Sequence, residues 1–98
     1  MVEKVYAAAA RIELSERKIP FEREKTLPVR YHGHLLCHHS IDLFVAEKLV
    51  VEIKSVEQLH AVHVAQTVCY IRLAGVRAGL LVNFNVPILR EGIRRLVL

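Results

Sequence analysis

The pattern of hydrophobic and polar positions in the first half of the chain predicts one helix followed by three strands. Residues 3–17 include four consecutive alanines and end before Pro20, so this segment is predicted to be a helix. Its apolar stripe consists of Val5, Ala8, Ala9 and Ile12. Three runs rich in strand-forming residues follow, separated by turn residues: 21–31, 35–45 and 49–54.

The second half of the chain is predicted to add one helix and two strands. Ser55 followed by Gln58 is a capping-box pattern, which predicts that a helix begins at Ser55. The helix is expected to run to about Ala74, because Gly75 is a natural C-terminal cap. It is apolar on most sides, so it is expected to be buried against a sheet or a partner chain. Two strands complete the chain, at residues 78–84 and 93–98.

This order of elements, αβββαββ, predicts an α/β fold with a mixed central sheet flanked by both helices. The chain has 98 residues, which is enough for one domain over residues 1–98 and not for two. Hydrophobic residues make up 53% of the chain, a high share for a domain so small. We therefore expect the protein to be a homo-oligomer.

Three charged residues on the second and third strands form the first candidate site. Glu52 and Lys54 must share one face, because side chains alternate along a strand. Asp42 joins them if the hairpin loop has an odd length, most simply Ala46-Glu47-Lys48. The two carboxylates would then lie with Cβ atoms about 5 Å apart, and Mg²⁺ or Mn²⁺ between them would offset their repulsion. The alternative is a cross-strand charge pair on a solvent-exposed face.

Both predicted helices carry polar side chains that could reach this face. Glu3 and Glu13 share a stripe of the first helix, and a solvated helix surface is the alternative for both. His63, Gln66 and Tyr70 share one face of the second helix. The alternative for Gln66 is that it satisfies a backbone group.

The net charge of +4 favours a polyanionic partner. The six histidines lack the spacing of a zinc site, and Cys37 and Cys69 are expected to be reduced. The sequence has no apolar run of membrane-spanning length and no signal-peptide pattern. We therefore expect a cytoplasmic protein without a membrane partner.

The order of elements and the spacing of Asp42, Glu52 and Lys54 resemble the core of the PD-(D/E)XK nucleases, which have a restriction-endonuclease-like fold. More narrowly, the chain resembles the GxxExxY proteins of that superfamily. The matching segments are residues 3–6, 19–24, 41–43, 51–54 and 79–84, and Ala65-Gln66 with Tyr70. One departure is Lys18, which stands where glycine is usual.

The resemblance implies metal-dependent hydrolysis of phosphodiester bonds in nucleic acid, with DNA as the first expectation. Together with the net charge of +4, it predicts a basic surface near the acidic site. It implies that Asp42 and Glu52 bind Mg²⁺ or Mn²⁺, that Glu3 completes the metal site, and that Lys54 assists the attacking water. Gln66 matches a glutamine that is often found on the helix after the Glu-x-Lys motif. Two alternatives remain: an inactive module of the same fold that binds nucleic acid or protein, and a structural subunit of a larger assembly.

Overall fold

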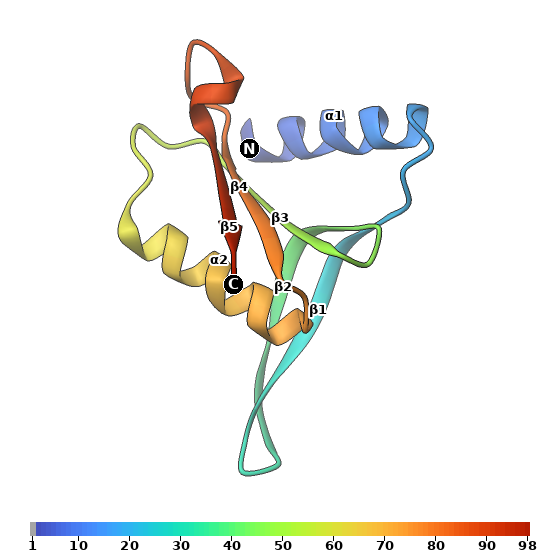
Figure 1. The fold of residues 1–98 in the computed structure, drawn as a ribbon, viewed down its shortest axis with the longest axis vertical. Coiled ribbons are helices and arrows are strands. Elements are labelled where there is room, and N and C mark those ends of the chain that lie inside the picture. The colour runs from blue at the N-terminus through green and yellow to red at the C-terminus, as the bar shows by residue number, and fades with distance from the viewer. Residues whose placement is uncertain (1) are drawn as a thin grey trace.

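A computed structural model describes residues 2–98, and over that range it contains the predicted order of two α-helices and five strands plus one short 3-10 helix (Figure 1). The elements are α1 (Val2–Glu16), β1 (Phe21–Tyr31), β2 (His34–Val45), β3 (Leu49–Lys54), α2 (Ala61–Ala74), β4 (Ala78–Asn83), η1 (Leu89–Gly92) and β5 (Ile93–Val97). The strands form one sheet in the order β1-β2-β3-β4-β5. Only β3 and β4 are parallel, and α2 connects them. The predicted α/β fold with a mixed sheet is therefore confirmed.

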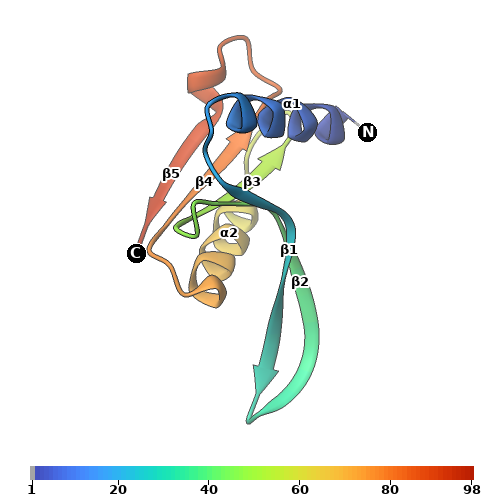
Figure 2. The same ribbon diagram turned by 90° about the vertical axis from the view of Figure 1, so that its right-hand side faces the viewer.

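The two α-helices cover opposite faces of the sheet, and each buries its own hydrophobic cluster (Figure 2). The cluster under α1 is built on Leu43, Val45 and Ile53 of the sheet, and the helix adds Tyr6, Ala7, Ala10 and Leu14. The cluster under α2 joins Tyr70 and Ile71 to residues of the first three strands, namely Leu27, Ile41, Phe44 and Val50. Alternate residues of β3 therefore face different helices: Ile53 faces α1, and Val50 faces α2.

The face of α1 that packs on the sheet is not the apolar stripe seen in the sequence. Val5 and Ile12 of that stripe are 65% and 59% exposed, whereas Tyr6 and Ala10 contact the sheet. The aromatic ring of Tyr6 contributes to this orientation, because it stacks on Phe84 with the ring centroids 4.4 Å apart. Neither α-helix within residues 2–98 combines the length and apolar character needed to cross a membrane.

The first two strands form a long hairpin that leaves the rest of the sheet (Figure 2). β1 and β2 pair along almost their whole length, from Phe21–Val45 to Tyr31–His34. β2 and β3, in contrast, form three pairs, the last of which is Leu43–Val51. The sheet therefore forks where β2 separates from β3, and this fork is where the predicted site lies.

The prediction that α2 begins at Ser55 is wrong, because the helix begins at Ala61. Tertiary hydrogen bonds hold the preceding segment in an extended form. The Ser55 N–H donates to Glu3 Oε1 at 3.3 Å. The N–H of Val56 donates to Asn83 Oδ1 at 3.0 Å, and its carbonyl accepts from Asn83 Nδ2 at 2.9 Å. The helix is capped by a histidine instead, since His63 Nδ1 accepts a 2.9 Å bond from the backbone N–H of His60.

Both α-helices end with the same pair of backbone hydrogen bonds, known as the Schellman motif. The motif requires one residue with positive φ after the helix. Gly75 fills this position after α2 with φ of 72°, as the sequence predicted. Lys18 fills it after α1 with φ of 58°. The bonds are Lys18 N to Ser15 O and Ile19 N to Leu14 O after α1, and Gly75 N to Arg72 O and Val76 N to Ile71 O after α2.

Candidate active site

Asp42 and Glu52 face each other at the fork between β2 and β3. The paired residues of β2 and β3 are Val45–Leu49, Phe44–Val50 and Leu43–Val51. In this register Asp42 and Glu52 are the next residues opposite each other. The intervening loop is the predicted three-residue turn, Ala46–Lys48. This odd loop length places the two carboxylates on the same face of the hairpin.

The Asp42 carboxylate is held by the backbone of the neighbouring strand. Its Oδ2 accepts a 2.7 Å hydrogen bond from the N–H of Ile53. On its other side, the ladder between β1 and β2 lacks a pair between Asp42 and Glu24, and Glu24 has a positive φ of 50°. Asp42 therefore lies at an irregularity shared by three strands, where its side chain completes the backbone hydrogen bonding.

Glu52 is a buried carboxylate, and one of its two oxygens lacks a hydrogen-bond partner. The residue is 5% exposed, and its Oε1 is buried and makes no hydrogen bond in the described part of the chain. Burial raises the pKa of Glu52 from 4.5 to about 9, with the negative charge of Asp42 as the second cause. The positive charge of Lys54 acts in the opposite direction. A buried acceptor in this state needs either a proton or a cation.

Lys54 is half-buried at the end of β3, and its backbone is firmly held. It aligns with Asn83 of β4, and its carbonyl accepts a 2.9 Å hydrogen bond from the N–H of Phe84. Asn83 is itself buried and binds Val56 through both groups of its side-chain amide. Asn83 thus positions the segment that follows Lys54. Our sequence reasoning missed this role, although a polar residue at the end of an apolar strand was a usable signal.

Tyr70 is the residue of α2 that approaches the carboxylates. It is buried, and burial followed by the charge of Glu52 raises the pKa of its hydroxyl. The centroid of its ring lies 5.3 Å from the ring centroid of His39 on β2. The sequence placed Tyr70 and Gln66 on one helix face, but Gln66 is exposed. A catalytic role for Gln66 stays a prediction.

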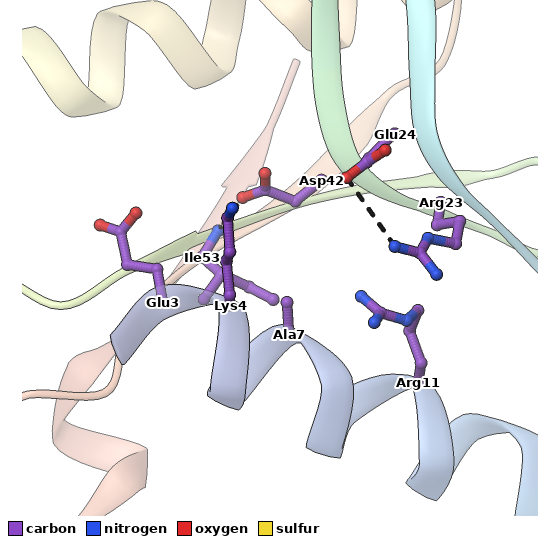
Figure 3. A pocket seen from close by; sticks show the side chains of 8 residues that line it. All are labelled: Glu3, Lys4, Ala7, Arg11, Arg23, Glu24, Asp42 and Ile53. Atoms are coloured by element: carbon purple, nitrogen blue, oxygen red, sulfur yellow. Dashed lines mark hydrogen bonds and ion pairs between the residues drawn. The ribbon is translucent and has the colours of Figure 1, made fainter. Parts of the chain in front are cut away.

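Glu3 lies at the edge of the same site, on the first turn of α1. It lines a pocket of about 420 Å³ together with Asp42 and Ile53 (Figure 3). Its Oε1 accepts the hydrogen bond from Ser55, one residue after Lys54. Glu13, the other glutamate of that helix stripe, is exposed and pairs with Arg17 at 3.3 Å.

Two carboxylates and water are sufficient for a magnesium site. Within residues 2–98, no three side chains of the types His, Cys, Asp and Glu form a group that could hold a metal ion. Mg²⁺ is nevertheless commonly bound by one or two carboxylates and retains several waters. The buried Oε1 of Glu52 beside Asp42 fits such an ion, because the cation would replace the missing partner. Glu3 as a third ligand stays a prediction.

Comparison with known proteins identifies the family of the chain. Neither a curated protein nor a solved structure matches the chain. A family model described as the PD-(D/E)XK nuclease superfamily matches residues 1–96. The match covers nearly the whole chain, including the fork, the Glu-x-Lys segment and both helices. The chain therefore belongs to the PD-(D/E)XK nuclease superfamily.

Proposed function

We propose that this protein hydrolyses phosphodiester bonds of nucleic acid in a reaction that depends on Mg²⁺ or Mn²⁺. The observation that carries the proposal is the buried Oε1 of Glu52, which lacks a partner and lies beside a second carboxylate. Burying the Glu52 carboxyl group beside the half-buried Asp42 is costly unless a cation or a proton is present. Metal binding would account for such a pair at the fork of a nuclease fold.

In this proposal Asp42 and Glu52 hold the metal ion. When bound, the ion would polarise the scissile phosphate and lower the pKa of a coordinated water. The hydrogen bond from Ile53 orients Asp42, so its carboxylate needs little reorganisation on metal binding. Lys54 contributes a positive charge next to Glu52, suited to orienting the attacking water and stabilising negative charge on the phosphate.

Two further residues enter the proposal through the family resemblance. Glu3 is assigned as an additional metal ligand, and its position in the pocket with Asp42 is compatible with that role. Gln66 is assigned a catalytic role on α2, where its side chain is exposed. We also propose that the chain belongs to the GxxExxY group within the superfamily, on the segments matched in the sequence. DNA is the first substrate class to test.

The test is a cleavage assay on single- and double-stranded DNA and RNA, with Mg²⁺, Mn²⁺ or EDTA. We expect cleavage with a metal ion and none in EDTA. Lys54→Ala should bind Mn²⁺ in calorimetry as the wild type does but lose cleavage. Lys48→Ala is the matched control, because Lys48 is an exposed lysine of the hairpin loop. A wild type that binds metal and cleaves none of the four substrates would overturn the proposal, whereas nucleic-acid binding without metal binding would favour the inactive module.

A further inference from the structure

Two arginines from different elements converge on the pocket that contains Asp42. Arg11 extends from α1 and Arg23 from β1, and both line the pocket of about 420 Å³ (Figure 3). Both also line the adjoining hollow between α1 and β1. In Figure 3 the two guanidinium groups are directed into the same space, at the opposite end of the pocket from Glu3. Glu3 and Asp42 therefore lie at one end of the pocket, together with Lys4, and the two guanidinium groups lie at the other end, together with Glu24.

The positive end of this pocket is poorly neutralised by the protein. Arg11 forms no salt bridge with any residue of the range 2–98. Arg23 contacts Glu24 at 3.9 Å, a long distance between side chains that are both more than half exposed. Such a contact contributes little. Two guanidinium groups in one concave site repel each other, and an anion between them would remove that repulsion.

We propose that Arg11 and Arg23 together bind a backbone phosphate of the substrate strand, next to the scissile phosphate that a metal ion on Asp42 and Glu52 would bind; of these two carboxylates, Asp42 lines the pocket with the arginines. This inference rests on the proposed nuclease function, because it assumes that the carboxylate end receives the scissile phosphate. Guanidinium groups match phosphate because they offer paired donors to two of its oxygens. The site therefore selects a strand with at least two successive phosphates over a mononucleotide.

The two arginines are positioning residues in this scheme, since they do not touch the reacting atoms. Their position also defines a path for the substrate. The strand would pass along the groove between α1 and the β1–β2 hairpin, from Glu3 at one end to Arg23 at the other. Arg11 on α1 and Arg23 on β1 would thus form the predicted basic surface. They are 12 positions apart in the sequence, and the fold brings them together.

Measuring DNA binding in the absence of cleavage tests the arginine site independently of catalysis. Anisotropy of a fluorescein-labelled DNA duplex would be measured in EDTA over a range of salt concentrations. Arg11→Ala and Arg23→Ala should each weaken binding roughly tenfold at low salt. Each should also lower the slope of log affinity against log salt by about 1. Arg11→Lys should keep the slope but lose affinity, because it retains the charge without the paired donors.

Arg72→Ala is the matched control, because Arg72 is an exposed arginine on α2, across the sheet from the pocket. It should leave both affinity and slope unchanged. Thymidine monophosphate should compete only weakly with the labelled duplex for binding to the wild type and to the variants. The inference is overturned if the double variant Arg11→Ala/Arg23→Ala binds as Arg72→Ala does, or if the wild type does not bind the duplex. Loss of binding in the variants, with a wild type that never cleaves, would uphold the phosphate site and reject the nuclease.

Discussion

The Oδ2 atom of Asp42 accepts a 2.7 Å hydrogen bond from the backbone N–H of Ile53, at the point where β2 and β3 stop pairing. The carboxylate supplies the acceptor that a backbone carbonyl would supply if the ladder continued. Asp42 therefore has a structural role at the fork in addition to its proposed role as a metal ligand. The two roles can be separated by substitution.

Asp42→Asn and Asp42→Ala should both lose metal binding but differ in stability. Asparagine keeps a side-chain oxygen that can accept from Ile53, whereas alanine leaves this N–H without its partner. We expect Asp42→Ala to lose about 1–3 kcal/mol of unfolding free energy relative to Asp42→Asn. Urea denaturation in EDTA measures the difference, and Mn²⁺ calorimetry measures metal binding. Equal stability of the two variants would contradict a structural role for the carboxylate.

Glu52 should make the metal-free protein less stable as pH rises. Its pKa is about 9 in the folded protein against 4.5 for an ordinary glutamate, so the folded state retains the proton. The contribution of Glu52 to the unfolding free energy is then fully present below pH 4.5. It is lost as pH rises towards 9, by up to about 1.4 kcal/mol per pH unit. Glu52→Gln should remove this dependence.

The measurement is urea denaturation of the wild type and of Glu52→Gln in EDTA, at several pH values across that window. The difference between the two proteins should change steadily with pH in favour of the glutamine variant. Adding Mg²⁺ at the upper end should stabilise the wild type and leave Glu52→Gln unaffected. Parallel stability profiles would show that Glu52 is not held in the buried, protonated state.

Lys18→Gly should stabilise the protein. Lys18 has a φ of 58° after α1, a conformation that costs a residue with a Cβ atom more than it costs glycine. Replacement by glycine should raise the unfolding free energy by about 0.5–1 kcal/mol. This net gain already includes the opposing effect of glycine, which increases the entropy of the unfolded chain. Lys18→Ala is the control, since it removes the charge and keeps the strain. A gain in stability in the alanine variant equal to that in the glycine variant would assign the effect to charge.

Gly79→Ala should destabilise the packing of α2 on the sheet. A Cβ atom at Gly79 would lie 2.7 Å from Cδ1 of Ile71 and 3.0 Å from the carbonyl oxygen of Val50. We expect a loss of about 1–3 kcal/mol. Ile71→Val removes that Cδ1 atom, so the double variant should lose less than the sum of the single losses. Thermal denaturation of the four proteins gives the coupling, and simple additivity would argue against this contact.

The exposed stripe on α1 should mediate self-association. Val5 and Ile12 lie two helical turns apart on the outer face of α1, and both are more than half exposed. We expect a homodimer by light scattering at micromolar concentration, and a monomer for the variant Val5→Glu/Ile12→Glu. Glu13→Gln, on the same helix, should remain dimeric. A wild type that is monomeric under these conditions would contradict the expectation of an oligomer.

The sequence by itself determined the local features of this protein. Strand periodicity placed Glu52 and Lys54 on one face, and the Ala46–Lys48 loop brought Asp42 opposite Glu52. The glycine after α2 marked the end of that helix correctly. These features depend on residues that are close in the chain, so propensity, periodicity and loop length were sufficient to predict them.

The tertiary structure decided the features that depend on distant segments. α2 begins at Ala61 and not at the predicted Ser55. The reason is that Ser55 bonds to Glu3, 52 residues away, and Val56 bonds to Asn83, 27 residues away. The packing of α1 on the sheet, which includes the stacking of Tyr6 on Phe84, likewise determined which face of the helix is buried. Capping patterns and apolar stripes specify what a segment can do locally. Which possibility is realised depends on the partners that the fold brings next to it, because tertiary hydrogen bonds and ring stacking outweigh small differences in local propensity.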